Sequence, residues 1–250
     1  MAHDAGSSLL PPSWTVPNEF RRRLGDQAGR QRLMAAEGHL LLVLHAPPSA
    51  DSAQRQGRFY WRDAAGRWTP SGASPAQPGV GDMLREYERA IEALQQEEDK
   101  AQSARDYFDL LNWLNPLVRA ARNLHQTIQE AREAAPEDRS LILWRDRAYV
   151  ISRSAELLHN DAKNALDFAV AQRAEEEAVS SRRAATAAHR LNILVACFFP
   201  IATLATIFGM ELNNGLGDLD RQHAPLPMLA ILAVGLLLGV VLMLFINRKP

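Results

Sequence analysis

Two long stretches near the C-terminal end of the chain contain no charged residue. Residues 191–208 make up the first block of eighteen, and residues 226–246 the second block of twenty-one. As helices they would be about 27 and 31 Å long, close to the ~30 Å hydrocarbon thickness of a bilayer. A buried hairpin of a soluble protein is the alternative, but two uncharged blocks this long are rare outside membranes. The pattern therefore predicts two transmembrane helices.

The two blocks differ in polarity. The second block is apolar all round, which suits a helix that faces lipid. The first block contains Asn192, Pro200, Thr203 and Thr206. Such a mixed helix is better placed against other helices or along a water-filled path.

The charges that flank the blocks predict their orientation. Arg182, Arg183 and Arg190 precede the first block, and Arg248 and Lys249 follow the second. The connection, residues 209–225, carries three acidic residues and one arginine. The positive-inside rule then places both termini in the cytoplasm and the short acidic connection outside the inner (cell) membrane. The first ten residues show no secretory signal, in agreement with this orientation.

Residues 82–134 keep a helical period of apolar positions before the membrane blocks. Pro116 is expected to kink or split this run, because its ring blocks the hydrogen bond to residue i−4. Pro136 suits the first turn of a new helix that begins at about Glu137. No further helix breaker occurs before Pro200, so this helix would run about 100 Å into the bilayer.

The first part of that long helix has a heptad-like pattern, followed by an alanine-rich part over residues 169–188. The small residues would let several helices approach closely, as in an oligomeric stalk. A solvated helix of high alanine propensity is the alternative. Continuity with the membrane block favours the stalk. The heptad positions are Ala148, Ala155, Ala162 and Ala169, with Ile151, Leu158 and Ala165 between them.

Short strand signals occupy the first eighty residues. Residues 39–45 (HLLLVLH) read as a buried strand, 57–62 and 66–69 as a hairpin, and 30–35 as a weaker strand. Residues 71–81, rich in Pro, Gly and Ser, form a linker. The fold class predicted is a mainly α membrane protein with a small N-terminal α/β cap, a long helical stalk and two transmembrane helices. Its predicted domains are 1–80, 81–190 and 191–250.

Composition removes several classes of function. The chain has 28 basic and 29 acidic side chains, which gives no reason to expect nucleic acid as a partner. Cys197 is the one cysteine, so a disulfide or thiolate cluster within one chain is ruled out. No phosphate-binding glycine loop, paired-histidine metal motif or Ser/His/Asp arrangement is visible. We expect neither an enzyme nor a bound cofactor.

The end of the first block resembles the CorA family of magnesium channels. Residues 199–211 read FPIATLATIFGME, and the family's pattern is an apolar helix with a central proline that ends in Gly-Met-Asn. A second membrane helix with a basic tail then closes the chain, as Arg248 and Lys249 do here. Weaker likeness extends over residues 106–190 and over 39–48, the latter similar to a central strand of the family's cytoplasmic domain.

The resemblance implies a homopentamer in a lipid bilayer that moves Mg²⁺ or another divalent cation. The first membrane helix of each subunit would line the pore, and the turn Gly209, Met210 and Glu211 would ring its outer mouth. Mg²⁺ keeps its water shell, so such a ring would hold the hydrated ion. Glu211 would be the metal-binding residue. The pore-lining residues implied are Thr206, Ala202, Phe199, Ala196, Asn192, Leu191 and Ala188.

Two residues differ from the family's pattern and leave two alternatives open. Glu211 stands where the family has Asn, and five carboxylates would attract cations and raise some of their own pKa values. Phe199 is bulky where the family usually has methionine. Both differences favour a non-conducting structural or regulatory relative. A transporter of Zn²⁺ or another transition metal on the same fold is the second alternative, since Gly-Met-Glu is not the magnesium-selective sequence.

Overall fold

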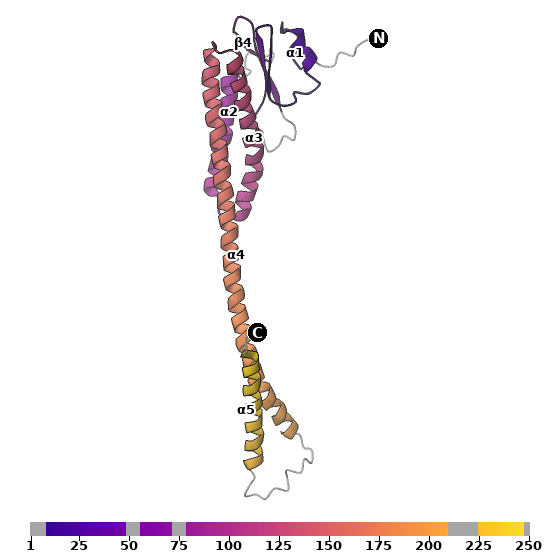
Figure 1. Ribbon diagram of the computed structural model, residues 1–250, viewed down its shortest axis with the longest axis vertical. Coiled ribbons are helices and arrows are strands. Elements are labelled where there is room, and N and C mark those ends of the chain that lie inside the picture. The colour runs from indigo at the N-terminus through magenta and orange to yellow at the C-terminus, as the bar shows by residue number, and fades with distance from the viewer. Residues whose placement is uncertain (1–8, 49–55, 72–78, 210–224, 248–250) are drawn as a thin grey trace, which may run out of the picture. The chain divides into compact units, whose positions relative to one another are not determined.

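The computed structural model describes residues 9–48, 56–71, 79–209 and 225–247. The chain divides into two compact units, Met1–Ala171 and Gln172–Pro250. The fold is mainly helical, with a small N-terminal sheet and one very long helix, as the sequence predicted (Figure 1). The elements in chain order are α1 (Asn18–Arg23), β1 (Arg32–Ala36), β2 (His39–His45), β3 (Gly57–Arg62), β4 (Trp68–Pro70), α2 (Val80–Lys100), α3 (Ala104–Ala134), α4 (Arg139–Gly209) and α5 (Pro225–Asn247).

The four strands form an antiparallel meander in the order β1-β2-β3-β4. A two-residue turn joins β1 to β2, and both of its residues, Glu37 and Gly38, have positive φ angles of 52° and 77°. This turn geometry matches the twist of the strands it joins. Strand β2 lies in the middle and is buried on both faces, which explains its unbroken apolar run.

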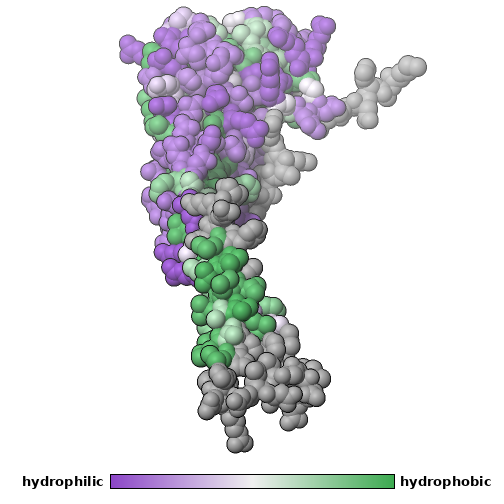
Figure 2. All heavy atoms as spheres, turned by 60° about the horizontal axis from the view of Figure 1, so that its bottom comes forward, coloured by the Kyte–Doolittle hydropathy of each residue, from purple (hydrophilic) through white to green (hydrophobic). Residues whose placement is uncertain are grey.

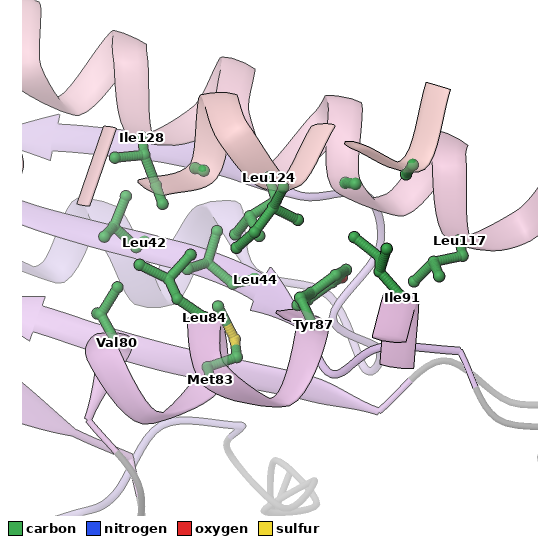
Figure 3. Packing of buried hydrophobic residues seen from close by; sticks show 14 of the residues in the cluster. Leu42, Leu44, Val80, Met83, Leu84, Tyr87, Ile91, Leu117, Leu124 and Ile128 are labelled. Atoms are coloured by element: carbon green, nitrogen blue, oxygen red, sulfur yellow. The ribbon is translucent and has the colours of Figure 1, made fainter. Parts of the chain in front are cut away.

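One face of the sheet packs against the helices. Leu40, Leu42 and Leu44 of β2 join side chains of α2, α3 and the first part of α4 in a single core (Figure 3). Tyr87 of α2 lies fully buried there and donates a hydrogen bond from its hydroxyl to the His45 carbonyl at 3.1 Å. Further members of this core are Val80, Met83, Leu84, Ile91, Leu117, Leu124 and Ile128.

The opposite face of the sheet is covered by the N-terminal segment. Leu41 and Val43 point to this side, where they meet Trp14 and Phe20. Phe20 belongs to α1, a helix that the sequence analysis did not anticipate. The sheet is therefore a middle layer between a small N-terminal cover and the helices, which is why β2 has large apolar residues at all five positions between its terminal histidines.

The helical run over residues 82–134 is two helices, as a split run predicts, but the break lies between Lys100 and Ala104 and not at Pro116. Helix α3 starts after Ser103, whose hydroxyl accepts a hydrogen bond from the Asp106 amide at 3.2 Å. The Asp106 carboxylate in turn accepts one from the Ser103 amide at 2.8 Å. This capping box begins a new helix. Pro116, by contrast, lies inside α3 without ending it.

Helix α4 begins at Arg139, two residues after the predicted start. Asp138 caps its start, because the Asp138 carboxylate accepts a hydrogen bond from the Ser140 amide at 3.0 Å. From there the helix has 71 residues, or about 106 Å of rise. Pro200 lies within it and does not end it.

Candidate pore helix

The C-terminal part of α4, residues 172–209, carries the first apolar block and belongs to the second compact unit. Among the residues that the structure describes, one helix is long and apolar enough to cross a bilayer, within Arg139–Leu204. None of the residues in its apolar stretch is buried. Helix α5 contains a shorter apolar stretch, Leu232–Val241. Apolar side chains gather on the surface of this unit (Figure 2).

Helix α5 packs directly against this part of α4 through two glycines. A Cβ atom added to Gly239 would lie 3.0 Å from the Cys197 carbonyl oxygen and 3.1 Å from the Cys197 Cα atom. At Gly235 the added atom would lie 3.3 Å from the Ile201 Cα atom. The two glycines are spaced four apart, and small residues at this spacing let membrane helices approach closely.

The contact with α5 divides α4 into a covered and an uncovered side. Cys197, Ile201 and Leu204 lie on the covered side and are half-buried, while Thr206 and Phe199 are exposed. Thr206 follows Leu204 by two residues, which is about 200° around a helix, so the two point to opposite sides. The uncovered side therefore faces away from α5.

The predicted pore-lining residues follow this uncovered side. Asn192, Phe199 and Thr206 are spaced seven apart, a spacing that keeps them on one side of a helix. Ala196 is half-buried and lies at the edge of the side that α5 covers, whereas the other six predicted residues are exposed. The exposed six are Ala188, Leu191, Asn192, Phe199, Ala202 and Thr206. The structure thus brings six of the seven residues onto one side of one helix.

Two polar features lie along this part of α4. The Thr206 hydroxyl donates a hydrogen bond to the Ala202 carbonyl at 2.8 Å. Its proton is therefore engaged within the helix, and the oxygen keeps lone pairs that can accept from water. Pro200 has no amide hydrogen, so the Ala196 carbonyl receives no hydrogen bond from residue i+4. The Thr206 oxygen lies on the uncovered side and suits the water shell of a cation, whereas the Ala196 carbonyl belongs to a half-buried residue at the edge that α5 covers.

The predicted outer ring lies at the limit of the described chain. Gly209 is the last residue of α4. Met210 and Glu211 lie outside the described residues, so the metal-binding role of Glu211 stays a prediction. Among the described residues, no group of three or more His, Cys, Asp or Glu side chains is arranged to hold a metal ion.

The sequence analysis missed the glycine pair of α5. Gly235 and Gly239 form a Gly-x-x-x-Gly motif inside an apolar helix, a pattern typical of close helix pairs in membranes. This signal was present in the sequence and would have predicted which side of α5 packs against α4.

No protein-family profile and no curated protein match the chain. Solved structures do. The structure of the full-length CmaX protein matches with a TM-score of 0.51 and 15% sequence identity, over 92% of this chain and 83% of that one. The CorA magnesium transporter from Methanocaldococcus jannaschii matches with a TM-score of 0.38 and 11% identity, over 90% of this chain and 81% of that one.

The likeness to CmaX shows that the chain has a CorA-like fold. The resemblance seen in residues 199–211 is thereby confirmed at the level of the fold. The structural match covers nearly the whole chain, including the sheet and helices for which the sequence likeness was weak. Function is a separate matter, because a shared fold hosts different activities.

Proposed function

We propose that the protein is a transporter of divalent cations, Mg²⁺ above all, with a pore lined by the uncovered side of α4. One observation carries this proposal: the exposed stripe of Asn192, Phe199 and Thr206 lies opposite the side that α5 covers. A helix with one side packed and a mixed polar side left open suits a water-filled path between several copies.

The proposed assembly is a homopentamer, with α4 and α5 crossing the inner (cell) membrane and both termini in the cytoplasm. The first apolar block ends helix α4, and the second forms α5 over Pro225–Asn247. Helix α5 would face lipid, since its described side chains away from the glycines are apolar and exposed. Five copies of Glu211 would concentrate cations at the outer mouth, with Gly209 and Met210 setting the turn.

Passage of the ion would be passive and hydrated. Mg²⁺ loses its waters reluctantly, so contacts with the water shell suit it better than direct coordination. The Thr206 oxygen, on the uncovered side, is an acceptor for those waters. Phe199 is the narrowest point expected, because its bulky side chain lies on the uncovered side, where the residue is 67% exposed.

Flux into liposomes tests this proposal. The purified protein is reconstituted, and uptake of Mg²⁺, Zn²⁺, Ni²⁺ and Co²⁺ is measured for the wild type and for Glu211→Asn. Uptake of Mg²⁺ by the wild type is the expected result. A strong preference for Zn²⁺ would favour a transition-metal transporter instead. Silence of both proteins toward all four ions would contradict transport.

Phe199 favours one second candidate, a non-conducting relative closed by a hydrophobic ring. Five phenyl rings at one level can exclude water and stop ions. Phe199→Ala is expected to raise Mg²⁺ flux at least tenfold if the ring restricts passage. Phe198→Ala is the matched control, because Phe198 is 63% exposed but lies about 100° away around the helix. Equal flux in the two variants would remove Phe199 from the path.

A further inference from the structure

Four basic side chains precede the apolar part of α4 within nine residues: Arg182, Arg183, His189 and Arg190. All four are exposed. Residues 178–210 contain no aspartate or glutamate, and no acidic side chain of the described chain forms an ion pair with the three arginines. After the acidic run Glu175–Glu177, this part of the helix therefore carries only positive charge, and no ion pair within the described residues neutralises it.

Arg183 and Arg190 lie on the side of α4 that α5 packs against. Arg183, Arg190, Cys197 and Leu204 are spaced seven apart, so they follow one side of the helix. Gly239 of α5 contacts Cys197 on that side. The proposed pore stripe lies about 200° away. These arginines therefore point away from the cation path, toward the surroundings of the hairpin.

The C-terminal end of α5 lies level with this positive region of α4. Gly235 contacts Ile201 and Gly239 contacts Cys197. A step of four residues forward along α5 thus corresponds to four residues back along α4, so the two helices run antiparallel. The same register brings Asn247, the last residue of α5, level with His189. Two more basic residues, Arg248 and Lys249, follow directly in the sequence.

We propose that Arg190, together with Arg182 and Arg183, forms a binding site for the phosphodiester headgroups of anionic phospholipids. Arg190 adjoins the apolar block and would lie within the headgroup layer, about 5–7 Å thick on each side of the hydrocarbon. A guanidinium donates two parallel hydrogen bonds to a phosphate. Arg182 and Arg183 lie about 12 Å before the block, within one Debye length (~8 Å) of that layer.

This inference rests on the membrane location in the proposed function but not on ion conduction. The three arginines are expected to contribute to lipid binding in different ways. Loss of Arg190 removes a direct contact, whereas loss of Arg182 and Arg183 removes attraction through water. The contribution of Arg182 and Arg183 to lipid binding is therefore expected to fade in high salt, whereas that of Arg190 should persist in part.

Native mass spectrometry of the full-length protein in detergent is the test. The protein is mixed with phosphatidylglycerol, with phosphatidylcholine, or with inorganic phosphate, and bound adducts are counted. Each Arg→Gln change near the surface is expected to weaken phosphatidylglycerol binding about fivefold at low salt. Arg173→Gln is the matched control, since Arg173 is exposed on the same helix about 27 Å before the block.

The possible outcomes separate the lipid site from the alternatives and from the proposed transport. Retention of phosphatidylglycerol by the wild type, with loss in Arg190→Gln and none in Arg173→Gln, supports the site. Equal retention of phosphatidylcholine, or equal loss in both variants, overturns it. Binding of inorganic phosphate as strong as that of the lipid would overturn lipid as the ligand. A protein that binds the lipid but carries no ions would contradict only the proposed transport.

Discussion

Asp138 connects the sheet to the start of the long helix. Its carboxylate accepts hydrogen bonds from Arg62 Nε and Trp68 Nε1, both at 2.9 Å, while it also caps α4. The Asp138 and Arg62 side chains are only 9% and 11% exposed. Burial acts to raise the pKa of this carboxyl, but the hydrogen bonds from Trp68 and Arg62 outweigh it and lower the pKa below its ordinary value.

Asp138→Asn is expected to lower the free energy of unfolding of the first unit by about 2 kcal/mol, because charged hydrogen bonds of this kind are worth about 1.5–3 kcal/mol. All five tryptophans lie in that unit, so their fluorescence during thermal unfolding reports it. Asp109→Asn is the control, since its ion pair with Arg105 is exposed and worth about 0.5 kcal/mol. Equal losses in the two variants would contradict the role of Asp138.

The same contact predicts a dependence on pH. Because the pKa of Asp138 is lower in the folded protein, its contribution to stability is complete above the unfolded value of about 4 and is lost as the pH falls through the folded value. The difference in melting temperature between wild type and Asp138→Asn should therefore shrink below about pH 4. A difference in melting temperature that grows below pH 4 would show that folding raises the pKa of Asp138 instead of lowering it.

At the scale of elements, the α4–α5 pair depends on Gly239. A methyl group there would press on the backbone of Cys197, which cannot move aside as a flexible side chain would. Gly239→Leu is expected to open the contact at a cost of about 1–3 kcal/mol, although leucine has the higher helix propensity. Gly235→Leu should cost less, since its nearest neighbour is the Ile201 side chain.

Cys197 offers a direct measurement of this opening, because it is the single cysteine and is half-buried beside α5. Its rate of labelling by N-ethylmaleimide should rise about tenfold in Gly239→Leu, corresponding to 1.4 kcal/mol. Ala233→Leu, at an exposed position of α5, should leave the rate unchanged. An unchanged rate in Gly239→Leu would show that the two helices do not pack through this glycine.

Local patterns in the sequence predicted the helices and strands better than the contacts between them. The uncharged blocks predicted helices, and the apolar run of β2 predicted a central strand. Both patterns can be seen in the sequence because consecutive residues of one element must all be apolar. The capping box at Ser103 and the glycine pair of α5 were readable but were overlooked. The contact of Arg62 with Asp138 was not readable, because it joins residues 76 apart and only the fold brings them together. The role of Glu211 stays a prediction.

At the scale of the whole molecule, a line of large apolar side chains on α4 lacks a cover. Leu143, Val150 and Leu157 are spaced seven apart and are 60%, 60% and 44% exposed. The heptad positions expected from the sequence, such as Ala148, Ala155 and Ala162, lie in the chain's own core and are not free for a partner. In the proposed homopentamer a second copy of the chain would instead cover this exposed line. The assembly and the exposed line then have a common explanation.

Light scattering in detergent tests that explanation. The wild type should have a protein mass of about five times the 27.8 kDa of one chain. Val150→Asp places a charge on the apolar line and should shift the mass toward one chain. Lys163→Asp, on an exposed position away from the line, should leave it unchanged. A wild type of one-chain mass would rule out the homopentamer.

The most direct test of the pore concerns which side of α4 meets water. In a Cys197→Ala background, Ala202→Cys places a thiol on the uncovered side and Leu204→Cys places one on the side that α5 covers. A charged, membrane-impermeant thiol reagent should label the first in liposomes and block Mg²⁺ flux, and should spare the second. Faster labelling of Leu204→Cys than of Ala202→Cys would contradict a water-filled path along the uncovered side of α4.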